Sequence, residues 1–194
     1  MDSSIIEEKV RLVQTGHTEA FSAIVSNYQQ QLFVYCCRML GNEQDAEDAV
    51  QEIFLKAFKS IASYKPSGGF NAWMYKISYH HCLNLAHRRR LFGKLVKFIN
   101  RQSTVESAEQ SYERNSFSEP LSRALDSLEY VERNLLILNV FHEKTYSEIG
   151  VIIGKSPESV RKKLTRVRKK VKLMLNKRQE EEKWGHSPLI QTKS

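Results

Sequence analysis

The stretch from Asp45 to Arg90 constrains the fold most, because two amphipathic helical patterns follow one another within it. In the first, apolar residues recur at three- and four-residue spacing, the period of one buried helical face. They are Ala46, Ala49, Val50, Ile53, Ala57 and Ile61, with Phe54 and Phe58 widening the stripe. The opposite face grades from acidic to basic along the helix. That grading suits the helix dipole, so a merely solvated face is one interpretation of it.

A second helical pattern begins after the break at Pro66, Gly68 and Gly69, with Phe70 and Trp73 facing inward. Its other side carries Tyr75, Lys76, Tyr79, His80, Asn84, His87 and Arg88. Aromatic side chains among basic and amide ones can hold unstacked bases against a phosphate backbone. The alternative is a helix whose tyrosines only cap the core. The run Arg88 to Arg90 is either a phosphate-binding patch or a solvated helix end, and a net charge of +8 favours the patch.

The spacing of apolar residues predicts an all-α chain of two small helical domains. Residues 1–93 form a bundle in which a short helix over 5–14 precedes a long one, capped by Thr18 and ended by Gly41. Residues 94–120 are polar, rich in serine and without a period, which predicts a flexible linker. Residues 121–178 form the second helical domain, and residues 179–194 a poorly ordered tail.

The second domain contains the signature of a helix-turn-helix. Thr145 can cap a helix with Glu148 at the capping-box position, and Gly154 supplies the tight turn. Ser156 then caps the next helix, whose first residue is Pro157, where a missing N–H costs nothing.

Basic charge is concentrated on that last helix. Residues 155–178 carry 11 Lys or Arg against one acidic residue, so this segment is more positive than the whole chain. Such localisation indicates a phosphate-facing helix, with a basic coiled coil or a calmodulin-type target helix as the alternative. A recognition helix enters the major groove by its N-terminal half, so five side chains are expected nearest the bases. They are Ser159, Arg161, Lys162, Thr165 and Arg166.

Other function classes find little support. Cys36, Cys37 and Cys82 form no CxxC pair and are interpreted as small buried hydrophobes, so neither a metal site nor a cofactor is predicted. The chain has no P-loop, GxSxG or GxGxxG motif, so it is not expected to be an enzyme. With no apolar run near the roughly 20 residues of a membrane span and no secretory signal, a cytoplasmic protein is expected.

Two strings carry a family resemblance. RMLGNEQDAEDAVQEIFLKAFKSI, followed by FNAWMYKIS, resembles the second region of bacterial sigma factors of the extracytoplasmic-function class, and TYSEIGVIIGKSPESVRKKLTRVRKKVKLML resembles their fourth region. The resemblance implies a transcription initiation factor that binds core RNA polymerase. It also implies promoter DNA as a partner, both duplex and melted, and an anti-sigma factor, which in some members is membrane-anchored.

The resemblance assigns three groups of residues. For the polymerase clamp these are Asp45, Glu47, Asp48, Gln51 and Glu52. For the −10 element, with the loop 62–69 capturing a flipped base, these are Lys65, Ser67, Phe70, Asn71, Tyr75, Lys76, Tyr79, His80, Asn84, Arg88, Arg89 and Arg90. For the −35 element these are Ser156, Ser159, Arg161, Lys162, Lys163, Thr165, Arg166 and Lys169.

The chain departs from the family pattern at three places. Glu129 stands where a proline is common, Glu158-Ser159 where Gly-Thr is common, and His80 where an asparagine is usual. These changes leave the class intact and bear on which promoter is recognised. The alternative function is a free-standing helix-turn-helix regulator that binds duplex DNA without polymerase.

Overall fold

The computed structural model describes residues 3–99 and 119–185, and among these every regular element is helical. Side chains are described for residues 3–91 and 121–176. The helices are α1 (Ser3–Gln14), α2 (Phe21–Leu40), α3 (Glu43–Ser60), α4 (Gly69–Ile99), α5 (Glu119–Asp126), α6 (Tyr130–Leu136), α7 (Tyr146–Ile153) and α8 (Pro157–Gly185). A π-helical turn, Ile137–Phe141, continues α6, and short 3-10 turns cover Thr18–Ala20 and Ile61–Ser63.

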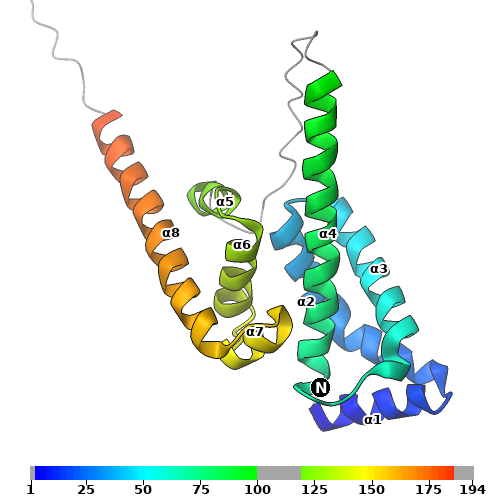
Figure 1. The fold of residues 1–194 in the computed structure, drawn as a ribbon. Helices are drawn as coiled ribbons and strands as arrows, with labels where there is room; N and C mark the ends of the chain where they lie inside the picture. The colour runs from blue at the N-terminus through cyan, green and yellow to red at the C-terminus, as the bar shows by residue number, and fades with distance from the viewer. Residues whose placement is uncertain (1–2, 100–118, 186–194) are drawn as a thin grey trace, which may run out of the picture.

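Helices α1 to α4 form an N-terminal unit in which α2 and α3 pack on α4 and α1 crosses its lower end (Figure 1). Each helix contributes one apolar stripe to the core, as its periodicity predicts. Examples are Val10 of α1, Leu32 of α2, Ile53 of α3 and Met74 of α4, all almost fully buried.

The boundary between α2 and α3 follows local chemistry, with one correction. Gly41 ends α2 in the left-handed conformation, at φ 84°, as predicted. Asn42 then caps α3, its side chain accepting from the backbone N–H of Asp45 at 2.7 Å. The prediction that Thr18 caps α2 is wrong: Thr18 begins a 3-10 turn, and α2 starts at Phe21 with no side-chain cap.

Helices α5 to α8 form a C-terminal unit, and its helix-turn-helix is confirmed in detail. Thr145 and Glu148 make the reciprocal capping box at the start of α7. Gly154 ends α7 at φ 68°, and Ser156 accepts from the N–H of Ser159 at the start of α8. Glu129, where the family often has proline, makes a second capping box with Glu132 and begins α6.

The helices run beyond the predicted domain boundaries. Helix α4 continues to Ile99 and α5 starts at Glu119, so both ends of the predicted linker are helical, and residues 100–118 lie outside the described residues. Helix α8 continues into the predicted tail as far as Gly185, because the segment QEEEKW contains good helix formers and no helix breaker.

The two units pack against each other along one face of α4. Helix α7 contacts α4, α6 contacts α2, and the buried apolar residues of both units form one connected cluster. In Figure 1, α7 lies between α8 and α4, so the helix-turn-helix turns its first helix toward the N-terminal unit and its second helix away from it. No helix in the described ranges is both long and apolar enough to cross a bilayer.

Candidate nucleic-acid interface

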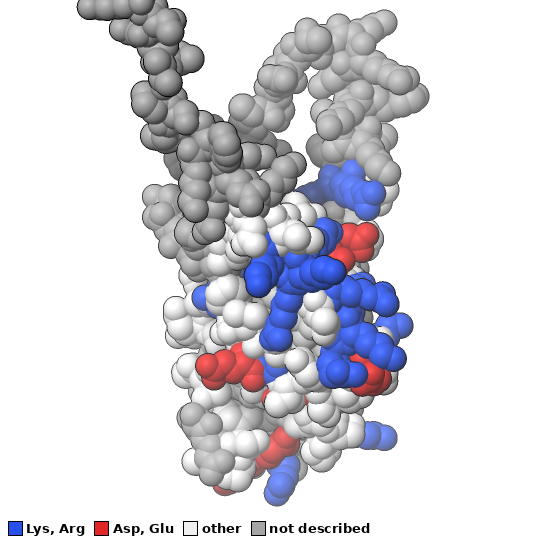
Figure 2. Space-filling view, turned by 90° about the vertical axis from the view of Figure 1, so that its left-hand side faces the viewer, with Lys and Arg blue, Asp and Glu red and all other residues white. Residues whose placement is uncertain are grey.

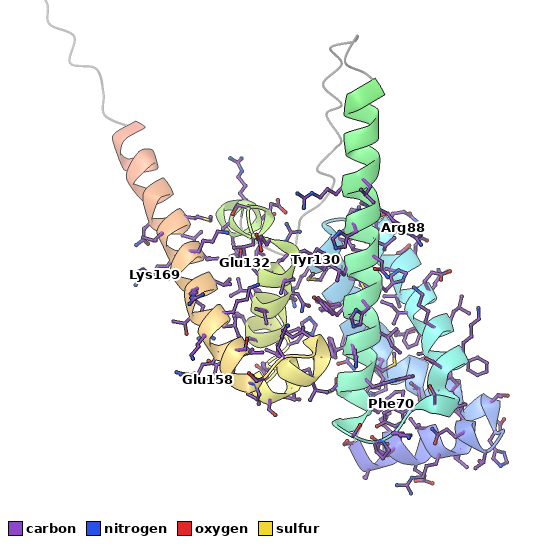
Figure 3. All side chains as sticks on the ribbon, viewed as in Figure 1. Phe70, Arg88, Tyr130, Glu132, Glu158 and Lys169 are labelled. Carbon is purple, nitrogen blue, oxygen red and sulfur yellow. The ribbon has the colours of Figure 1, made fainter. Side chains whose placement is uncertain are left out.

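Helix α8 presents a polar and cationic surface to solvent along its first four turns, because the apolar residues from Val160 to Val171 all turn inward. Val160, Leu164 and Val167 are buried at three- and four-residue spacing. The exposed side chains on the far side are Arg161, Lys162, Thr165, Arg166 and Lys169, which we call the α8 basic face. Figure 2 shows Lys and Arg gathered in a band on this side of the molecule, and Figure 3 shows Lys169 pointing away from α6.

The remaining predicted residues of α8 surround this face. Ser156 and Ser159 are exposed at the N-terminal end, where a major-groove helix meets bases. Arg161 is held by Glu158 in a two-pronged contact, with N–O distances of 2.9 and 3.1 Å. Lys162 lies 3.4 Å from the same carboxylate. Both cations are therefore pre-positioned beside one carboxylate at the start of the helix.

Other cations of α8 serve the fold of the C-terminal unit. Lys170 donates to Glu132 of α6 at 2.9 Å, and Arg168 donates to Asn139. The Glu132 carboxylate lies between α6 and α8 (Figure 3), where hydrogen bonds from Lys170 and the Glu129 N–H lower its pKa against burial, which acts to raise it. Lys163 is half-buried on the same flank. Charge counting along the sequence could not separate these cations, which lie toward neighbouring elements of the C-terminal unit, from those of the α8 basic face.

Helix α4 carries two parallel stripes of predicted −10 residues, one exposed to solvent and one buried. Lys76, His80, Asn84 and Arg88 recur every four residues and are all exposed. We call them the α4 stripe. Arg89 and Arg90 follow Arg88 in the chain and are also exposed, but they point to other sides of the helix, and Arg89 pairs with Asp45 at the start of α3. Figure 3 shows Arg88 on the upper part of α4.

The second stripe of α4 is buried, and Tyr75 in it packs against the C-terminal unit. Tyr75 is 1% exposed and Tyr79 is 7% exposed. The Tyr75 hydroxyl lies 2.8 Å from Nδ1 of His142, and the ammonium of Lys144 stands over the Tyr75 ring at 5.0 Å. Burial is the main reason why the pKa of Tyr75 is raised above its ordinary value. In this arrangement neither tyrosine is accessible to a nucleic-acid strand.

The loop before α4 combines exposed side chains with a core anchor. Lys65 and Ser67 are exposed, whereas Asn71 is half-buried. Phe70, at the lower end of α4 in Figure 3, packs its ring against Tyr28 and Tyr64 at 5.8 and 5.2 Å between ring centres. It thus supports the loop from within the core, and its ring does not face solvent.

Helix α3 exposes the predicted polymerase-binding residues Glu47, Asp48, Gln51 and Glu52, while Asp45 is partly covered by Asn42 and Arg89. Two large apolar residues on this exposed surface, Leu55 (52% exposed) and Phe58 (41% exposed), were not predicted as site residues. They border a hollow of about 420 Å³ lined by Phe21, Val25, Gln51, Phe54, Leu55 and Phe58. Leu55 stands out from the helical apolar period, and that signal could have revealed it.

Comparison with known proteins assigns the chain that carries these surfaces to a family. Residues 24–92 match Sigma-70 region 2, and residues 118–171 match Sigma-70 region 4. The chain is 30% identical over 170 residues to the RNA polymerase sigma factor YlaC of Bacillus subtilis, covering 86% of this chain and 98% of that one. The chain is an RNA polymerase sigma factor of the ECF class. Sigma factors of this family are non-catalytic and direct RNA polymerase to start transcription at specific promoters.

Other relatives agree with this assignment. The ECF RNA polymerase sigma factor SigW of Bacillus subtilis is 24% identical to this sigma factor over 188 residues, covering 88% of this chain and 97% of its own. The fold is similar to that of CnrH, solved in complex with the cytosolic domain of CnrY, with a TM-score of 0.65 and 21% identity. That match covers 90% of this chain and 98% of CnrH.

Proposed function

We propose that this sigma factor divides promoter recognition between the α8 basic face and the α4 stripe. The observation that supports this division is the presence of two exposed cationic surfaces, one on each helical unit. The α8 basic face suits the −35 duplex, because it combines phosphate-binding cations with polar side chains at the N-terminal half of a helix. The α4 stripe suits the melted −10 strand, with the loop 62–69 at its lower end holding an extruded base.

Two weak sites on one chain give strong binding together. Once one unit binds its element, the other acts at a high effective concentration set by the connecting segment. Promoter choice then depends on the spacing of the two elements as well as on their sequences.

Binding of the −10 strand along the whole of α4 requires the C-terminal unit to move away from it. The packing between the units is suited to such a movement, since it encloses the Nδ2 of Asn134 and the Nε2 of His142 without a hydrogen-bond partner in the described structure. A buried polar atom left unpaired costs about 1–3 kcal/mol. Separation from α4 uncovers Tyr75 and Tyr79 and lets them join the α4 stripe.

Helix α3 is proposed to dock on the clamp of RNA polymerase. Its exposed carboxylates surround an apolar centre formed by Leu55 and Phe58. An apolar centre with a polar rim is typical of protein-protein contacts whose affinity depends on a few large side chains.

The proposed location is the cytoplasm, where core polymerase and the chromosome are found. An anti-sigma factor is proposed as a further partner. The sigma factor RpoE of Bartonella quintana, solved in complex with the anti-sigma factor NepR, is 19% identical to this chain with a TM-score of 0.62. Co-purification from the source organism tests this, and a tagged chain that retains only polymerase subunits would refute it.

The proposed function is tested by run-off transcription with core RNA polymerase and fragments of the source genome. New discrete start sites, present only when the sigma factor is added, are expected and would reveal both promoter elements. If no new start appears while the protein alone binds a symmetric duplex tightly, the chain acts as a free-standing regulator and the proposal is wrong. A variant with Arg166 and Lys169 replaced by alanine is the matched control, since it lacks −35 contacts and keeps the polymerase surface.

A further inference from the structure

Helix α1 holds the loop 62–69 at both of its ends. At the start of the loop, Nε2 of Gln14 donates to the carbonyl oxygens of Ile61 and Tyr64, at 2.8 and 3.0 Å. At its end, Oε1 of Glu7 accepts from the backbone N–H of Phe70 at 3.1 Å. The same carboxylate oxygen accepts from the Tyr64 hydroxyl at 2.7 Å. Two side chains on one helix therefore hold residues at both ends of the loop.

The loop depends on this support because its own residues cannot supply it. Gly68 and Gly69 have φ angles of 98° and 82°, a conformation open to glycine but strained for other residues. As neither glycine has a side chain, neither can cap the start of α4, whose first N–H groups need acceptors. Glu7 accepts from one of these groups across 63 positions of sequence, and its negative charge suits the positive end of the α4 dipole.

Glu7 also orients the aromatic floor beneath the loop. Its contact fixes the Tyr64 ring, which packs against Phe70 and Trp73 with ring centres 5.2 Å away in each case. Burial and the Glu7 carboxylate raise the pKa of Tyr64, so its hydroxyl remains a donor across the physiological range. Glu7 and Gln14 together therefore fix the aromatic rings beneath the loop, the carbonyl groups at its start and the first turn of α4.

We propose that Glu7 and Gln14 are positioning residues for −10 recognition. They act through the loop 62–69, whose shape determines how well it receives an extruded base. This role rests on the proposed function of the loop. Helix α1 lies before residue 24, where the match to Sigma-70 region 2 begins. Glu7 and Gln14 would therefore influence promoter strength without touching DNA.

The test combines variants of the protein with DNA templates that each lack one base. Holoenzyme carrying E7Q, E7A or Q14A is assayed for open-complex formation on the promoter that run-off transcription delivers. The assay is repeated on templates with an abasic residue at each non-template −10 position in turn. The matched control is E8Q, because Glu8 is exposed on the same helix. Unfolding temperature and affinity for core polymerase are measured for every variant.

E7A and Q14A are each expected to weaken open-complex formation roughly 3- to 30-fold, the effect of losing one or two hydrogen bonds. The loss should fall below about 2-fold on the template that lacks the captured base, because a well-shaped loop has nothing to receive there. E7Q should retain part of the activity, since its amide oxygen still accepts, and E8Q should behave as wild type.

Two results would overturn the positioning role, and they differ from each other. If wild type is insensitive to every abasic position, the loop captures no base, and the −10 part of the proposed function fails with it. If wild type is sensitive but the variants lose the same factor on all templates, Glu7 and Gln14 only stabilise the fold. Q14A keeps the test decisive if E7A fails to fold, because Gln14 is exposed whereas Glu7 is half-buried.

Discussion

The hydroxyl of Tyr75 on α4 lies 2.8 Å from Nδ1 of His142, which follows the π-helical turn of the C-terminal unit. The ring of Tyr35 completes the cluster, with its centre 5.7 Å from the His142 ring and 5.5 Å from that of Tyr75. The Tyr35 hydroxyl also donates to Oδ1 of Asn134 of α6 at 2.7 Å. A residue predicted to line the path of the −10 strand is therefore part of the contact between the two units.

That contact should weaken in acid. The pKa of His142 is lowered to about 4. Burial is the main cause, and the positive charges of Arg38 and Lys144 add to it. Because this value lies below the ordinary one of 6.5, the separated state binds more protons between these two pH values. The stability of the packed arrangement is thus complete above pH 6.5 and declines as the pH falls toward 4. We expect the radius of gyration from small-angle X-ray scattering to rise over that interval.

The variant H142Q separates this effect from other titrations. His81, whose pKa is lowered mainly by burial and then by Lys56, destabilises the N-terminal unit in acid and remains in the variant. The part of the pH response due to His142 should disappear in H142Q. An NMR titration gives the decisive value: a His142 ring titrating near 6.5 would mean that the two units do not pack in solution.

Gly150 is a tightly packed position in the helix-turn-helix. A Cβ built there lies 2.6 Å from the carbonyl oxygen of Lys155, closer than real contacts allow. Because backbone must shift to relieve this contact, G150A should destabilise the C-terminal unit by about 1–3 kcal/mol. Thermal unfolding should show the loss together with weaker −35 duplex binding, while affinity for core polymerase persists. The exposed S147A on the same helix is the control, and equal stability of the two variants would contradict the packing argument.

The cations of α8 should separate into two classes by experiment. K162A and R166A remove outward charges, so each should weaken duplex binding and reduce the slope of log affinity against log salt by about 1. K170A breaks the 2.9 Å contact with Glu132 and should instead reduce the stability of the C-terminal unit, by up to about 1 kcal/mol. Fluorescence anisotropy over a salt series and thermal unfolding measure the two effects. Equal salt slopes for K170A and R166A would argue against the division.

Leu55 should contribute to polymerase binding without contributing to the fold. Because its side chain is 52% exposed, L55A should leave the unfolding temperature nearly unchanged. Affinity for core polymerase should fall by about 1–2 kcal/mol if Leu55 is buried in the complex. V140A, another exposed apolar position on the C-terminal unit, provides the comparison. If L55A binds core polymerase as tightly as wild type, the docking surface does not include the centre of α3.

Features that depend on neighbours three or four residues away were predictable from the sequence. Thr145 and Glu148 form their capping box, Gly154 makes its turn, and Pro157 opens α8, because these contacts are complete within one helical turn. The one wrong cap prediction, at Thr18, also concerns a choice made within one helical turn. The chain enters α2 through a 3-10 turn, and a good capping residue three positions early is not used.

The sequence by itself determined the helical character of the chain, the caps of its helix-turn-helix and the concentration of basic charge on one helix. It did so because helix periodicity and capping are local and charge is a property of composition. Tertiary structure alone decided that Tyr75 is covered while Lys76 beside it is exposed, and that Glu7 and Gln14 hold a loop some fifty positions away. Each of these depends on which helix packs on which face, a long-range choice that spacing within one helix does not record.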